Sequence, residues 1–168
     1  MREVSPATKE LARRLLVHEA GGRQASEDLA EATERAFQRL RQRLARLIGL
    51  AGFNALLARA LRLAQADHPA LERVAFDEHA ATGLTGARQF ATAAAGDPAE
   101  AGAALVAVVA QFIWLLITFI GEDLGVRLVR EAWPDLTNGG MIPPGWRQEH
   151  ERAAPRDDST AADGGTWP

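Results

Sequence analysis

The fold of this chain is decided by residues 101–133, AGAALVAVVAQFIWLLITFIGEDLGVRLVREAW. The segment carries no charge from Ala101 to Gly121, and then Glu122 and Asp123 follow together. An uncharged run of about 20 residues is long enough to cross a bilayer. It also suits the central helix of a soluble bundle, which is apolar on every side because it has neighbours on every side.

The sequence beyond the acidic pair favours the soluble interpretation, because one apolar stripe continues past the charges. Its members are Ile117, Ile120, Leu124, Leu128 and Val129. No arginine cluster flanks the uncharged run closely enough to set a membrane topology. We therefore expect a core helix that a second copy of the chain shares in a homodimer. The residues expected in this core or dimer interface are Phe112, Ile113, Leu116, Ile117, Ile120, Leu124 and Leu128. The alternative is a single membrane span over 103–121.

Composition narrows the class of protein without naming a function. The chain has 168 residues, a net charge of −3 and 47% hydrophobic residues, which is typical of a globular domain. There is no cysteine, so disulfides, thiol catalysis and thiolate metal sites are excluded. The N-terminal segment MREVSPATKELARRLL lacks the apolar core of a signal peptide. We expect a cytoplasmic protein, with association with the inner membrane as the alternative.

Capping signals and apolar periodicity predict an all-α bundle of four to five helices in one domain over 1–137. Ser5 is placed to cap a first helix with Pro6 at its first position, and Asp97 and Pro98 are placed in the same way before the last helix. Convincing strand patterns are missing. The predicted helices lie near 6–20, 26–48, 53–66, 69–79 and 98–133, and the last of them is long and very apolar.

The second predicted helix carries an apolar stripe on one side and arginines on the other. The stripe runs from Phe37 to Ala51 at spacings of three and four. After Gly52 the apolar residues lie almost on the opposite side of the helix from this stripe, if the helix is continuous. Either the chain breaks within IGLAGF, residues 48–53, or one long helix is buried on different faces; we favour the break, because Gly49 and Gly52 weaken a helix. The predicted partner-binding face consists of Arg35, Arg39, Arg43 and Arg46.

The C-terminal segment 138–168 is rich in glycine, proline and small polar residues, so it cannot build a core. We expect it to be flexible or disordered. Trp146 and Trp167 are large aromatics in these polar surroundings, and exposed tryptophans can anchor an interface.

No catalytic constellation is visible in the sequence. There is no HExxH, no phosphate loop and no GxSxG, and the four histidines are scattered. If the bundle bound a metal or were an enzyme, its site would use Asp77, Glu78 and His79. The simpler interpretation, which we favour, is that these are ordinary polar residues at the end of a helix. We expect no enzyme activity, no metal and no cofactor.

We expect a non-enzymatic helical adaptor or regulatory subunit that acts through protein–protein interaction. Its expected partners are a second copy of itself and an acidic protein that meets the arginine face. Nucleic acid is disfavoured, because acidic residues at 27–34 and 67–78 dilute the basic field. The alternatives are a small single-span membrane accessory protein and a metal-binding or enzymatic bundle.

Overall fold

The computed structural model describes residues 4–93 and 97–138. These residues form seven α-helices, one 3-10 helix and one pair of two-residue strands. The all-α class is therefore confirmed. The number of helices exceeds the four to five expected, because the predicted helix over 98–133 is divided and because the short helices at Ala87–Ala93 and Pro134–Asn138 were not predicted.

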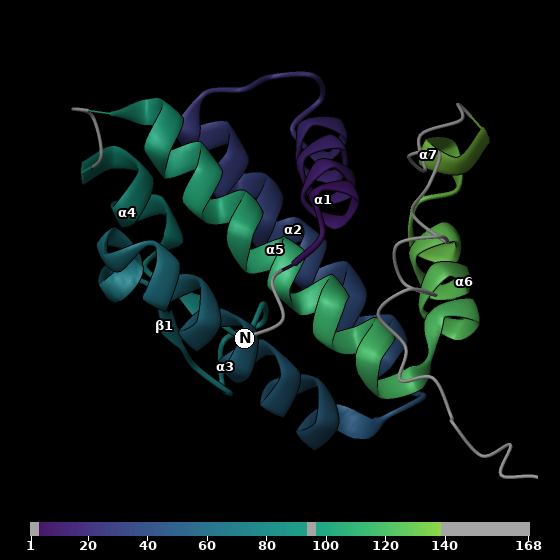
Figure 1. The fold of residues 1–168 in the computed structure, drawn as a ribbon. Helices are drawn as coiled ribbons and strands as arrows, with labels where there is room; N and C mark the ends of the chain where they lie inside the picture. The colour runs from purple at the N-terminus through teal and green to yellow at the C-terminus, as the bar shows by residue number, and fades with distance from the viewer. Residues whose placement is uncertain (1–3, 94–96, 139–168) are drawn as a thin grey trace, which may run out of the picture.

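The longest helix, α5 (Pro98–Ile120), runs through the middle of the bundle. Figure 1 shows α3 (Gly49–Asp67) on one side of it and α1 (Pro6–Glu19) and α2 (Ser26–Leu44) on the other. Contacts with α1, α2, α3, α4 (Ala87–Ala93) and α6 (Glu122–Ala132) cover α5 in different places. The apolar run at 103–120 is thus largely buried by the chain itself.

The core of the described residues is one continuous apolar cluster centred on α5. Phe112 lies between Phe37 of α2 and Phe53 of α3, with ring centroids 5.3 and 5.5 Å apart. All three rings are fully buried. Aromatic pairs at this separation add a directional attraction to the burial of their area.

Two helix starts agree with the capping signals in the sequence. The Ser5 side chain accepts a hydrogen bond from the Thr8 amide, and Pro6 opens α1. The Asp97 side chain accepts a hydrogen bond from the Glu100 amide, and Pro98 opens α5. These bonds satisfy amides that have no partner inside their own helix.

The predicted break after the second helix is present, slightly earlier than the favoured position. α2 ends at Leu44, a turn follows, and α3 begins at Gly49, whose φ is 75°. Glycine adopts this backbone conformation without the clash that a Cβ atom would cause. The predicted ranges 26–48 and 53–66 therefore become Ser26–Leu44 and Gly49–Asp67.

The prediction of a single helix over 98–133 is wrong. α5 stops at Ile120, Gly121 takes φ 88° and ψ 158°, and α6 starts at Glu122. The stripe that passes the acidic pair in the sequence is thus divided between two helices of different direction, as Figure 1 shows. α6 ends at Ala132, and Pro134 opens the short helix α7 (Pro134–Asn138).

The predicted helix over 69–79 is also wrong. Only a 3-10 helix, η1 (Pro69–Arg73), forms there, and a small antiparallel pair follows: β1 (Ala75–Phe76) and β2 (Leu84–Thr85). Gly83 and Gly86 both have positive φ. A Cβ atom at Gly86 would collide with the carbonyl oxygen of Arg73, so this glycine is needed for the close approach of the two segments.

Candidate interaction surface

The four arginines of the predicted basic face differ in their partners, although Arg35, Arg39 and Arg43 line one surface hollow. Arg35 bonds Glu31 at 2.7 Å and the backbone oxygen of Glu19 at 2.7 Å. Arg39 lies 3.1 Å from the Glu19 carboxylate and bonds the backbone oxygen of Ala132 at 3.2 Å. These two side chains connect parts of the bundle, and both remain partly exposed to solvent, at 39% for Arg35 and 46% for Arg39.

Glu19 is the centre of that junction. Its side chain is only 6% exposed, and the indole Nε1 of Trp133 donates to its Oε1 at 2.6 Å. The guanidinium of Arg39 also lies over the Trp133 ring, 5.8 Å from its centroid. A buried carboxylate needs such charged and hydrogen-bonding partners. The junction fixes the end of α1 and the start of α7 to α2.

Arg43 and Arg46 are the two remaining members of the predicted face. Both are exposed, and neither has an ion-pair partner in the described part of the chain. They lie at the end of α2 and in the turn before α3. These two are the members of the predicted basic face without an acidic partner inside the described part of the chain.

Large apolar side chains are exposed beside these arginines. The exposed fractions are 48% for Leu47, 46% for Leu50, 72% for Phe119 and 37% for Leu124. We call these four residues the apolar corner. No other large hydrophobic residue within 4–93 and 97–138 is exposed to this degree.

The packing of α3 on α5 brings the corner to one end of the bundle. Phe53 lies against Phe112, and His68 bonds Glu100 at 2.8 Å, so the two helices run antiparallel. The start of α3 therefore lies beside the end of α5. Figure 1 shows this end of the bundle, where the turn before α3, the last turn of α5 and the first turn of α6 come together.

Glu122 and Asp123 open α6 at the same end of the bundle. Neither has a basic partner among the described residues. Acidic side chains are favourable in the first turn of a helix. The end of the bundle with the apolar corner thus also carries Arg43 and Arg46 together with Glu122 and Asp123, and the two carboxylates line a hollow with Arg127 and Arg130.

The predicted core residues divide between the interior and this surface. Phe112, Ile113, Leu116, Ile117 and Leu128 are buried in the bundle. Ile120 is half-buried and Leu124 is exposed. The exposure of Leu47, Leu50 and Phe119 was not predicted; Leu47 belongs to the apolar stripe from Phe37 to Ala51, which indicates burial.

Asp77, Glu78 and His79 form an exposed turn. The amide of His79 donates to Asp77 Oδ1 at 2.9 Å, and the imidazole lies 3.5 Å from the same oxygen. A search of residues 4–93 and 97–138 finds no group of three side chains placed to hold a metal ion.

The C-terminal segment predicted as flexible, 138–168, lies outside the described residues except for Asn138, which ends α7. Trp146 and Trp167 belong to the part that is not described.

Comparison of the chain with protein-family models finds no match, and comparisons with curated proteins and with solved structures find none either.

Proposed function

We propose that this protein is a non-enzymatic helical adaptor or regulatory subunit that works as a homodimer through its apolar corner. The observation that carries the proposal is the exposure of Phe119 beside three further large apolar side chains at one end of the bundle. Contiguous exposed apolar surface on a soluble protein is typical of an interaction site. Phe119 is the side chain best placed to anchor it, since aromatic residues are enriched at interfaces.

A second copy of the chain is the partner that best fits this surface. In a twofold dimer the same patch of both copies forms the interface. If a residue of the first copy contacts a different residue of the second copy, the symmetry repeats that contact with the two copies exchanged. The end of the bundle with the corner carries Arg43 and Arg46 together with Glu122 and Asp123, and none of the four has an ion-pair partner among the described residues. A twofold axis through the apolar centre places the arginines of each copy against the carboxylates of the other.

The same pairing would make the second copy of the chain the acidic partner that the arginine face is expected to meet. Arg35 and Arg39 already contact Glu19, so Arg43 and Arg46 are the arginines of this face that lack an acidic partner among the described residues. In the dimer, the start of α6 in the second copy supplies that acidic surface.

The dimer is tested by reversing the two charged groups separately. Arg43→Glu with Arg46→Glu reverses the basic pair, and Glu122→Arg with Asp123→Arg reverses the acidic pair. We expect each double variant alone to be monomeric by light scattering after size exclusion. An equimolar mixture of the two should form a heterodimer, because both sets of ion pairs are restored.

The matched control reverses Arg59 and Arg62, which are exposed on α3 and lie outside the corner. This variant should remain a dimer. A wild-type chain that stays monomeric at high micromolar concentration would contradict the proposal. So would two charge-reversed variants that dimerise as well as the wild type.

A single-span membrane protein remains the second candidate, and one observation favours it. Among the described residues, α5 is the one helix long and apolar enough to cross a bilayer. Against this, 56% of its most apolar window is buried by the rest of the chain. Protein that is released from membranes only by detergent would support the span.

A further inference from the structure

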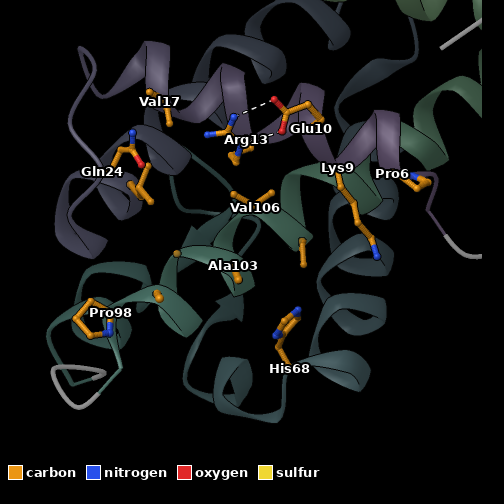
Figure 2. A pocket seen from close by; sticks show the side chains of 14 residues that line it. Pro6, Lys9, Glu10, Arg13, Val17, Gln24, His68, Pro98, Ala103 and Val106 are labelled. Atoms are coloured by element: carbon orange, nitrogen blue, oxygen red, sulfur yellow. Dashed lines mark hydrogen bonds and ion pairs between the residues drawn. The ribbon is translucent and has the colours of Figure 1, made fainter. Parts of the chain in front are cut away.

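A hollow lies between α1, the first half of α5 and the end of α3, away from the apolar corner. Its volume is about 770 Å³, which is within the range of small-molecule sites in proteins. Figure 2 shows it with Ala103 and Val106 of α5 in the centre, and with Lys9 of α1 and His68 at the end of α3 on one side.

The floor of this pocket is apolar and elongated. It is formed on α5 by small residues between Pro98 and Ala107, a stretch of about 14 Å along the helix axis. Val17 and Leu29 add apolar surface from α1 and α2. Ala103 is exposed although it lies in the most apolar helix, because no side chain of the bundle covers it. A floor of this shape fits an extended alkyl chain better than a flat ring.

The rim of the pocket carries positive charge. Lys9 is exposed, and it has no ion-pair partner among the described residues. Arg13 donates two hydrogen bonds to Glu10, each 2.9 Å long. These bonds, with a further one from Arg14, lower the pKa of Glu10 to about 2. The Glu10 charge is thus already neutralised by arginine, and Lys9 is left to attract an anion.

We propose that this pocket binds a single-chain amphiphilic carboxylate, with its alkyl chain along the floor on α5 and its carboxylate at Lys9. Binding buries the exposed surface of Ala103 and Val106, and it gives the Lys9 ammonium the charged partner that it lacks. The ligand belongs to the class of free fatty acids.

The experiment uses the full chain and dodecanoate below its critical micelle concentration. Calorimetry should show saturable binding of one dodecanoate per chain. Each methylene removed from the probe, from dodecanoate to decanoate to octanoate, should weaken binding by about fourfold. Lys9 is the only lysine in the sequence, so after reductive methylation with a ¹³C label its single side-chain resonance should shift on binding.

Two pairs of variants locate the site. Ala103→Phe fills the floor from an exposed position and should abolish binding, whereas Ala55→Phe, at an exposed position of α3 outside the pocket, should not. Lys9→Gln should weaken dodecanoate binding by about tenfold, and Lys9→Arg should retain it. Dodecanol, which has the same chain without the charge, should bind the wild type no better than dodecanoate binds Lys9→Gln.

Three results would overturn the proposal. Binding that is unaffected by Ala103→Phe would place the alkyl chain elsewhere, for example on the apolar corner. Equal binding of dodecanol and dodecanoate would remove the role of Lys9. Association with phosphatidylglycerol vesicles without binding of dodecanoate would assign the surface to a membrane and not to a free ligand.

Discussion

Glu19 shows how one side chain can connect distant parts of this chain. Its carboxylate is almost fully buried and meets Arg39 from α2 and Trp133 from the joint between α6 and α7. A carboxylate removed from water is stable only with such partners, and each partner in turn depends on the carboxylate. The arginines that resemble a binding face in the sequence are therefore partly structural.

Replacing Glu19 by alanine should lower the free energy of unfolding by about 2 kcal/mol, because the Arg39 guanidinium and the Trp133 N–H lose a charged acceptor. Urea denaturation measures this change. Glu31→Ala, which removes the exposed partner of Arg35, is the matched control and should cost about 0.5 kcal/mol or less. Equal losses for the two variants would mean that Glu19 does not hold the junction.

The element that most affects the shape of the molecule is the joint between α5 and α6. Gly121 has φ 88° and ψ 158°, a region of backbone conformation that is almost restricted to glycine. A Cβ atom there would meet no other atom within 4 Å, so only the backbone conformation requires glycine. The joint turns α6 away from α5 and brings Trp133 to Glu19.

Gly121→Ala should therefore destabilise the fold by about 2 kcal/mol through backbone strain alone. Gly52→Ala is the control, because Gly52 lies inside α3 and does not have a positive φ. Alanine has a higher helix propensity than glycine, but its Cβ atom would lie 3.3 Å from the Ile48 side chain. These two effects oppose each other, so the stability should change little. Thermal unfolding of both variants tests this. Unchanged stability of Gly121→Ala, together with a rise in helix content by circular dichroism, would indicate that α5 and α6 had joined into one helix.

At the scale of the whole molecule, the bundle uses its most apolar helix as its core and exposes large apolar side chains of it only near its C-terminal end. Leu115 is buried, whereas Phe119, four residues later, is the most exposed large hydrophobic residue of the described chain. The position of the two residues in the bundle, and not their hydrophobicity, sets this difference. Substitutions at these two positions can therefore distinguish the two candidate functions by experiment.

In a soluble bundle, Leu115→Arg should abolish folding, because it puts an unpaired charge in the core. Phe119→Arg should fold normally and lose the dimer. In a membrane span, Leu115→Arg would instead raise the free energy of membrane insertion by about 3 kcal/mol. The wild-type protein would then be extracted from membranes only with detergent. Fractionation without detergent, followed by circular dichroism of the soluble protein, distinguishes these outcomes.

Much of the fold could be predicted from the sequence because the signals are local. Ser5 and Asp97 cap the amides three residues after them, and proline at the next position fits the first turn of a helix. The reversal of the apolar phase after Gly52 predicts a break within 48–53, and Pro134 predicts the end of a helix. None of these inferences requires knowledge of what packs against the helix.

The candidate site could be predicted only in part. Arg43 and Arg46 have no ion-pair partner among the described residues, whereas Arg35 and Arg39 contact Glu19, which lies on another helix. Gly121 resembles an interior helical glycine until the packing of α6 fixes its conformation. The pocket beside Lys9 depends on how far α1 stands from α5, which no local pattern encodes.

By itself, then, the sequence determined the all-α class, the starts of α1, α2 and α5, and the apolar character of α5, because backbone hydrogen bonding and side-chain periodicity act over a few residues. Only the tertiary structure decided which arginines are free, where the last long helix breaks and which apolar side chains meet solvent. Those outcomes depend on contacts between residues far apart in the chain, such as Glu19 with Trp133 and the start of α3 with the end of α5.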